Sequence, residues 1–142
     1  MSPRLATFWA GGLLLGVDVA MVQEVLTARA ITSVPLAPPS MLGLLNLRGQ
    51  LVTAIDVRHR LGLPGRAAGD GVVNVIVPIG EDVVSLVVDR VGEVVDVDET
   101  LYEEVRDVVG DTIASVVTGA YKLEGALLLV LDAARLVPVT SG

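Results

Sequence analysis

The stretch Gly43-Leu-Leu-Asn-Leu-Arg-Gly-Gln-Leu-Val-Thr-Ala-Ile-Asp56 decides how the rest of the chain is interpreted. Two extended apolar runs meet at residues 46–49, where Asn46 and Arg48 interrupt an otherwise apolar strand sequence. The turn is therefore expected to present these polar side chains for a purpose other than packing. Gly49 allows the positive φ that a tight turn requires. The carboxylate of Asp56 is suited to cap a short helical turn at residues 57–61, and Gly62 is suited to end it.

The same pattern occurs again at residues 119–132. Gly119 to Asp132 aligns on Gly43 to Asp56 without a gap, and every matched position is offset by 76. A second capped helix is therefore expected at residues 133–137, with Asp132 in the place of Asp56. A weaker echo relates residues 16–25 to residues 87–94. Two copies are too few for a solenoid, so the repeat predicts two similar small β units related by a pseudo-twofold.

Composition excludes several classes of protein. The chain has 142 residues, of which 52% are hydrophobic but only 3% aromatic, so its core must be built from Val, Leu, Ile and Ala. A net charge of −7 argues against nucleic-acid binding, which needs clustered Lys and Arg. The absence of cysteine rules out a disulfide framework and suits a cytosolic protein. The apolar N-terminal run is broken by glycines, which argues against a membrane helix.

The remaining pattern predicts an all-β protein with a few short helices. A hairpin is expected from residues 5–17 around Gly11-Gly12, and a short amphipathic helix from residues 18–26 with Asp18 as its N-cap. Further strands are expected in the Val-rich segments 72–79, 83–91, 93–97, 113–123 and 126–131. Residues 64–71 are the most linker-like. Many short strands separated by turns indicate a sandwich or a pair of barrels.

No residue combination indicates catalysis or a metal site. His59 is the only histidine and there is no cysteine, so a zinc site has no ligand set, and a surface or cap histidine is the favoured interpretation. The cluster Asp96, Asp98 and Glu99 lacks the glycine and terminal glutamate of a calcium-binding loop, and a solvated acidic edge explains it. No cofactor is expected. An enzymatic interpretation would need turnover that is lost when His59 is changed.

The segments 43–49, 55–58 and 61–62 resemble the central motif of CheW-type chemotaxis coupling proteins. Residues 16–25 are similar to the N-terminal motif of that family, and residues 87–94 and 131–137 fit its second half. The resemblance covers residues 5–137 as a single CheW-like domain. Thr53, Leu15 and Ala10 depart from the family pattern, in which proline, an aromatic and a larger apolar residue are usual.

The resemblance implies two SH3-like, five-stranded β-barrel halves, approximately residues 5–66 and 72–137, and it allows strand exchange between them. It implies a non-catalytic, cytoplasmic adaptor that is recruited to membrane receptor arrays through its partners. The implied partners are the regulatory domain of a CheA-type histidine kinase and the cytoplasmic tip of methyl-accepting chemoreceptors, without nucleic acid or direct membrane insertion.

The family also implies which residues bind. Arg48, Asn46, Glu24 and Val22 match positions of its receptor-facing groove between the halves, and Gly43 matches a position that needs a small residue. Each has a plainer explanation: Arg48 could pair with an internal carboxylate, Glu24 could be an ordinary exposed residue, and Val22 could belong to the core. The repeated Asp56 and Asp132 are expected to be helix caps. The alternative function is a small-molecule sensor that uses the cleft between the halves.

Overall fold

The computed structural model describes residues 3–27, 29–65, 72–105 and 109–137. In chain order the elements are β1 (Arg4–Ala10), β2 (Leu13–Asp18), the 3₁₀ turn η1 (Val19–Met21), β3 (Glu24–Thr27), β4 (Met41–Leu47), β5 (Gln50–Asp56), α1 (Val57–Arg60), β6 (Val73–Ile79), β7 (Asp82–Val88), β8 (Arg90–Asp96), the 3₁₀ turn η2 (Glu99–Leu101), β9 (Tyr102–Glu103), α2 (Asp111–Ala114), β10 (Val117–Leu123), β11 (Ala126–Leu131) and α3 (Ala133–Leu136). The prediction of an all-β protein with a few short helices is confirmed.

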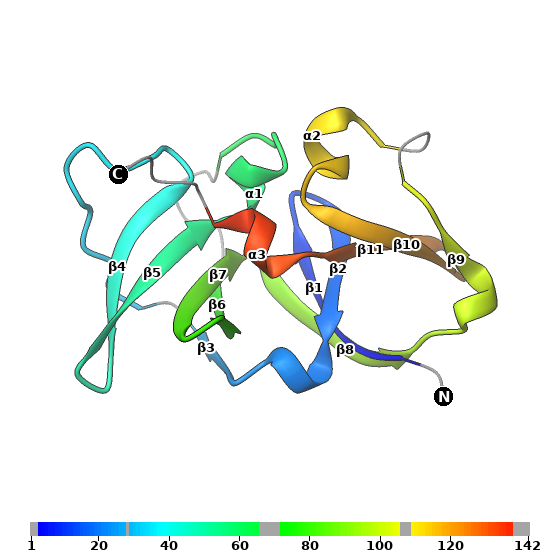
Figure 1. Ribbon diagram of the computed structural model, residues 1–142, viewed down its shortest axis with the longest axis horizontal. Coiled ribbons are helices and arrows are strands. Elements are labelled where there is room, and N and C mark those ends of the chain that lie inside the picture. Colours follow the sequence, from blue (N-terminus) through cyan, green and yellow to red (C-terminus); the bar gives the residue numbers. More distant parts are fainter. Residues whose placement is uncertain (1–2, 28, 66–71, 106–108, 138–142) are drawn as a thin grey trace.

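The strands form two curled sheets that lie side by side (Figure 1). One has six strands in the order β8-β1-β2-β11-β10-β9, and the other has five in the order β3-β6-β7-β5-β4. We call these the six-stranded and the five-stranded barrel. The prediction of five strands in each half is wrong for one of them, because the two-residue β9 pairs with β10 as an additional strand.

The repeat seen in the sequence is also a repeat in structure. The hairpins β4–β5 and β10–β11 each lead into a short helix, and each contains a register shift at the equivalent place, before Gly43 and before Gly119. Both glycines allow a crossing segment to come close: a Cβ on Gly43 would overlap the Thr32 carbonyl, and one on Gly119 would overlap the Tyr102 ring. Thr32 and β9 are the segments that pair with these hairpins, so the two glycines permit that pairing in each barrel.

The two halves of the sequence exchange strands. β1 and β2 belong to the six-stranded barrel, where β1 pairs with β8 and β2 runs parallel to β11. β6 and β7 belong to the five-stranded barrel, where β6 pairs with β3 and β7 runs parallel to β5. Each half of the sequence therefore supplies strands to both barrels, and neither barrel is contiguous in the chain.

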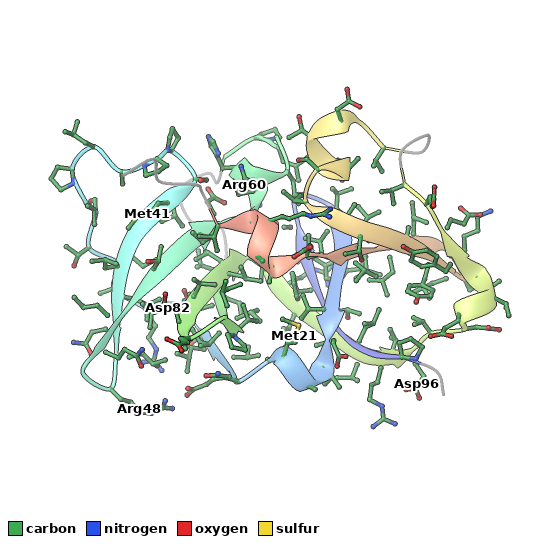
Figure 2. The ribbon with its side chains drawn as sticks, viewed as in Figure 1. Met21, Met41, Arg48, Arg60, Asp82 and Asp96 are labelled. Carbon is green, nitrogen blue, oxygen red and sulfur yellow. The ribbon has the colours of Figure 1, made fainter. Side chains whose placement is uncertain are left out.

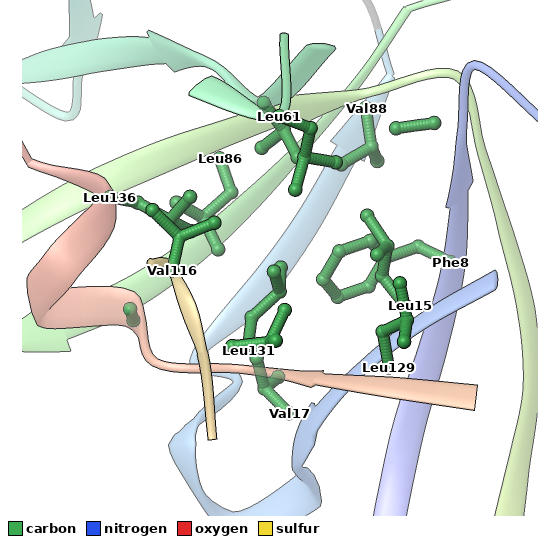
Figure 3. Packing of buried hydrophobic residues seen from close by; sticks show 14 of the residues in the cluster. Phe8, Leu15, Val17, Leu61, Leu86, Val88, Val116, Leu129, Leu131 and Leu136 are labelled. Carbon is green, nitrogen blue, oxygen red and sulfur yellow. The ribbon is translucent and has the colours of Figure 1, made fainter. Parts of the chain in front are cut away.

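The largest apolar cluster is shared by the two barrels (Figure 3). It includes Phe8 and Leu15 from the six-stranded barrel, Leu86 and Val88 from the five-stranded barrel, and Leu136 from α3. Two smaller clusters lie within the individual barrels, around Leu128 in one and around Val52 in the other. Because most buried apolar side chains are in the shared cluster, burial of this surface holds the barrels together.

Two expected elements were wrong. Residues 18–26 do not form one helix: Asp18 caps the three-residue turn η1, and the chain then extends into β3, where pairing with β6 satisfies its backbone. The strand expected from residue 113 begins only at Val117, because residues 111–114 form α2. The linker-like residues 66–71 lie outside the described part of the chain. Among the residues described, no helix has the length and apolar character that a membrane span requires.

Candidate functional site

The tip of the β4–β5 hairpin is a two-residue turn formed by Arg48 and Gly49. Leu47 pairs with Gln50 across it, and φ is +53° at Arg48 and +86° at Gly49. Two successive residues with positive φ are typical of the type I′ turn that suits the twist of a hairpin. The side chain of Asn46 stabilises the turn, since its Oδ1 accepts a hydrogen bond of 2.8 Å from the Gly49 N–H. The turn thus holds Arg48 at the end of the barrel (Figure 2).

Arg48 forms an ion pair with Glu24 at the start of β3. Its Nη2 donates to Glu24 Oε1 at 2.5 Å, while 71% of its side-chain surface remains exposed. The hydrogen bond to Glu24, followed by the attraction of that carboxylate's charge, raises the pKa of the Arg48 guanidinium above its ordinary value. Arg48 is therefore a fixed positive charge at working pH. A guanidinium has five N–H donors in a planar fork, so one that is oriented by Glu24 can present others to a partner.

The four residues expected to bind receptors differ in their surroundings. Glu24 and Arg48 are joined by the ion pair, and Asn46 lies in the same hairpin as Arg48. Val22 directly follows η1 and is partly buried against the shared apolar cluster, which favours its core role. Its position two residues before Glu24 nevertheless places it beside the ion pair in the chain. The structure thus gathers Arg48, Glu24 and Asn46 at one end of the five-stranded barrel.

The structure also exposes apolar residues that the sequence interpretation did not select. Val25 on β3 is exposed, and Val91 and Val94 on β8 are 45% and 54% exposed. β3 and β8 each form one edge of their sheet. Edge strands with exposed apolar side chains are surfaces on which other chains dock.

The internal repeat of the sequence could have pointed to these exposed valines. The pattern Val22-Gln23-Glu24-Val25 occurs again as Val91-Gly92-Glu93-Val94, offset by 69 positions. The second copy contains a bulge at Gly92: Ala6 pairs with Val94 and Phe8 with Val91, so two residues of β8 face Thr7 alone. Val91 also lines a hollow on the six-stranded barrel, together with Trp9, Leu14 and Arg90, whose guanidinium lies 4.6 Å from the centroid of the Trp9 ring.

Asp98 and His59, which were considered for chemistry, and Asp56 and Asp132, which were expected to be helix caps, have structural positions. Asp98 caps η2 by accepting from the Thr100 N–H, and Asp56 and Asp132 cap α1 and α3 in the same way. His59 lies exposed on α1. Within the described residues, no group of three or more His, Asp or Glu side chains is arranged to hold a metal ion.

Comparison with known proteins gives one consistent result. The sequence model of the CheW-like domain matches residues 4–140. The chain is 28% identical to the chemotaxis protein CheW of Bacillus subtilis (strain 168) over 130 residues, which cover 92% of this chain and 83% of the relative. It is 26% identical to the chemotaxis protein CheW of Rhizobium meliloti (strain 1021) over 129 residues, which cover 91% and 83% of the two chains.

A solved structure agrees over the whole length. The scaffolding protein TtCheW from Thermoanaerobacter tengcongensis superposes with a TM-score of 0.88 at 28% sequence identity, and the match covers 100% of this chain and 97% of TtCheW. The family model, the relatives and the fold thus point to the same assignment: the chain belongs to the CheW-like domain family.

Proposed function

We propose that this chain is a non-catalytic coupling adaptor of a chemotaxis-type pathway, which connects chemoreceptors to a CheA-type histidine kinase. The observation that supports this most directly is the end-to-end correspondence with the scaffolding protein TtCheW. The family is one of scaffolds and adaptors, and no comparison favours the alternative of a small-molecule sensor. In this role the protein works at the cytoplasmic side of receptor arrays, to which its partners recruit it.

The receptor-binding site that we propose is built around Arg48 and Glu24. Val22 and Asn46 flank this pair, and the exposed Val25 continues the surface along β3. We extend the site to Val91 and Val94 on β8, because these are the repeat counterparts of Val22 and Val25 and are exposed. A site that combines β3 and β8 takes residues from both barrels. Its character, an oriented guanidinium beside apolar side chains, suits the polar and apolar stripes of a helical hairpin.

The kinase partner is tested first by calorimetric titration of this protein into the isolated regulatory domain of a CheA-type kinase from the same source. Saturable binding near one-to-one is expected. Absence of heat and of co-elution, with both proteins folded, would remove the kinase from the proposal. The single tryptophan, Trp9, lies in the hollow beside β8 and provides a separate signal for the receptor, because receptor docking on that face would change its fluorescence.

The receptor site is tested by Arg48→Ala, measured as binding to a receptor-tip fragment. We expect binding to fall by about tenfold or more, as for the loss of one charged interface contact. The matched control is Lys122→Ala, which removes another exposed ion pair, Lys122 with Glu103 at 3.0 Å, on β10 and β9 and away from β3 and β8. Its binding should be unchanged.

A charge exchange separates recognition from simple structural pairing. In the double variant Arg48→Glu with Glu24→Arg, an ion pair can form in the opposite sense. If Arg48 contacts the receptor, binding stays weak in the double variant although the fold is retained. Recovery of full binding would show that only the ion pair matters, and it would contradict the role that we assign to the guanidinium.

A further inference from the structure

Besides the Arg48–Glu24 pair, the protein has an ion pair at the junction of the two barrels. It is formed by Asp89, the single residue between β7 and β8. Its carboxylate is held in the bidentate manner by Arg58 of α1: Nε donates to Oδ1 at 2.9 Å and Nη2 donates to Oδ2 at 2.8 Å. The side chains of Arg58 and Asp89 are only 15% and 20% exposed. Paired, parallel hydrogen bonds between a guanidinium and a carboxylate fix orientation as well as distance.

The partners of Asp89 come from both barrels. Arg58 follows β5 of the five-stranded barrel, whereas the third group on the carboxylate, the Gly11 N–H at 2.8 Å, belongs to the β1–β2 turn of the six-stranded barrel. The backbone N–H of Asp89 also donates to the Trp9 carbonyl of β1 at 2.8 Å. We call Arg58, Asp89 and Gly11 the clasp.

The turn is packed closely at this place. A Cβ on Gly11 would lie 2.6 Å from Cδ1 of Leu63, a residue in the segment that follows β5 and α1. The glycine therefore allows the β1–β2 turn to approach near enough for its N–H to reach Asp89. Packing and hydrogen bonding thus act together to hold one barrel on the other.

The pseudo-twofold repeat has no second clasp. The counterpart of Asp89 is Asp18, which accepts from the Ala20 N–H and caps η1. The counterpart of Arg58, by the offset that relates Asp56 to Asp132, is Ala134, and an alanine cannot form an ion pair. Within the described ranges, the repeat therefore places no second arginine–carboxylate pair opposite the clasp, and α1 and α3 are joined separately by Arg60, whose Nη2 donates to the Arg135 carbonyl at 2.7 Å.

The clasp lies at the opposite end of the strands from Val22 and Arg48, whereas Val91 of the proposed site is two residues from Asp89 on β8. β2 runs from the Gly11 turn to η1 and Val22, and β5 runs from the Arg48 turn to α1. Strands of six or seven residues span about 20 Å. Figure 2 shows this separation, with Arg60 of α1 near the top of the view and Met21 of η1 and Arg48 near the bottom.

We propose that Arg58 and Asp89 are positioning residues that set the angle between the two barrels. The shared core of Val, Leu and Ile is held by apolar burial, which has no directional preference and allows similar side chains to slide past one another. The bidentate pair removes that freedom at one end. Its consequence for the proposed site is a fixed relation between β3 and β8, and this second part rests on the proposed function.

The angle can be measured on the whole protein with paired spin labels, because the chain has no cysteine of its own. Gln50→Cys and Glu93→Cys place one label on an exposed residue of each barrel. We expect a single narrow distance distribution in the otherwise native protein. In Arg58→Met and in Asp89→Asn the distribution should broaden or shift by at least ~2 Å, the displacement that a rotation of a few degrees produces over a ~20 Å strand.

Two further variants keep the test decisive. Arg58→Lys retains the charge but cannot make the bidentate contact, so it should fold and give an intermediate broadening. Arg4→Met breaks an exposed ion pair within the six-stranded barrel and should leave the distribution unchanged. Unchanged distributions in Arg58→Met, Asp89→Asn and Arg58→Lys, with the fold confirmed by a dispersed NMR spectrum, would overturn the positioning role.

Partner binding then tests the second part separately. In Arg58→Met, affinity for the receptor-tip fragment should fall by about tenfold, although Arg58 lies at the far end of β5 from Arg48. An altered label distance with unaltered receptor binding would support the clasp and overturn its consequence for β3 and β8. If wild-type protein does not bind the receptor tip at all, the proposed function fails, whereas the label distances still decide the role of the clasp.

Discussion

Leu36 and Arg48 are the non-glycine residues with positive φ in the described part of the chain. Arg48 has the conformation because the two-residue turn demands it. Leu36, with φ of +62°, follows Pro35 in a turn closed by a hydrogen bond from the Ala37 N–H to the Val34 carbonyl. This is the arrangement of a type II turn, whose third position favours Gly or Asn. Leu36 is also fully exposed, so no apolar contact offsets the strain.

Replacement of Leu36 should therefore stabilise the protein. Asn tolerates the left-handed conformation, and Leu36→Asn is expected to raise the free energy of unfolding by about 0.5–1 kcal/mol. Leu36→Ala keeps the Cβ that causes the strain and should give little change. Urea denaturation of both variants measures the difference, and equal midpoints for Asn and Ala would show that the turn is not strained.

Two glycines with positive φ should respond very differently to alanine. At Gly43, with φ of +146°, the new Cβ would overlap the Thr32 carbonyl, so Gly43→Ala should cost at least ~3 kcal/mol or prevent folding. At Gly49, with φ of +86°, nothing lies within 4 Å of the new Cβ, and only the backbone strain of about 1–2 kcal/mol remains. The urea midpoints of the two variants test this order, and similar losses would contradict it.

Turn and cap residues were the most predictable part of the sequence. Gly62 ends α1 with φ of +72°, and the Gly11-Gly12 turn has positive φ at both residues. These positions depend on local backbone geometry, which a short stretch of sequence specifies. The Arg58–Asp89 contact was not predictable, because it joins residues 31 positions apart across two sheets whose pairing the sequence does not state.

The short turn η2 depends on a single carboxylate. Asp98 Oδ1 accepts from the Thr100 hydroxyl at 2.7 Å and from the Thr100 N–H at 2.9 Å. The side-chain hydrogen bond first, and the backbone one second, lower the pKa of Asp98 below its ordinary value of 3.8. The unfolded chain therefore binds a proton on Asp98 at a higher pH than the folded chain does.

The contribution of Asp98 to stability should be complete above pH 3.8 and should be lost as the pH falls through its lowered folded value. NMR titration of the Asp98 carboxyl carbon and of the Thr100 amide would follow this loss. Thr100→Val removes the hydroxyl and should move the pKa of Asp98 back toward 3.8. A titration that is identical in the two proteins would contradict the assigned cause.

Strands were easier to predict than the segments between them. The Val-rich run of β6 and the hairpins were clear from alternation and turn residues, but residues 18–26 were assigned to a helix because Val19, Val22 and Val25 also recur with helical spacing. Tertiary pairing decides such cases: the Gln23 N–H donates to the Ile76 carbonyl, and β3 then continues the sheet. So short a periodic pattern does not indicate whether a segment will pair with a distant strand.

The strand exchange has a consequence for dissected proteins. The pairings β1–β8, β2–β11, β3–β6 and β5–β7 all join the first half of the chain to the second. Fragments 1–65 and 72–142 should therefore each lack cooperative structure when alone, and should recover it when mixed. Dispersion of NMR amide signals measures this, and a well-dispersed spectrum from either fragment alone would contradict the prediction.

The contribution of the clasp to the stability of the protein can be measured without a receptor or kinase. Arg58→Met removes both guanidinium hydrogen bonds from the partly buried carboxylate of Asp89, so we expect a loss of about 2–3 kcal/mol in the free energy of unfolding. Arg4→Met, at an exposed pair, should cost less than about 1 kcal/mol. Equal losses in thermal or urea unfolding would show that the partial burial of the clasp has no energetic weight.

The internal repeat revealed that two related units exist, but it did not reveal how they interlock. Gly43 and Gly119 can be aligned because they are identical residues at equivalent places in the repeat. Whether a strand pairs within its own half of the chain or with the other half depends on contacts between residues far apart in the sequence. The prediction of two barrels came from the resemblance to a known family. The proposed binding residues depend on that resemblance more than on any local pattern.

The parallel pairing of β2 with β11 also fixes the order in which the protein can fold as it is made. The five-stranded barrel has all of its strands once Val88 has been synthesised, but the six-stranded barrel must wait for Leu131. At ribosomal rates of about 5–20 residues per second, the β1–β2 hairpin waits roughly 6–20 s for its partner strand. During that interval β1 can pair with β8, but β2 lacks its neighbour β11, so the β1–β2 hairpin is the segment most in need of protection by chaperones.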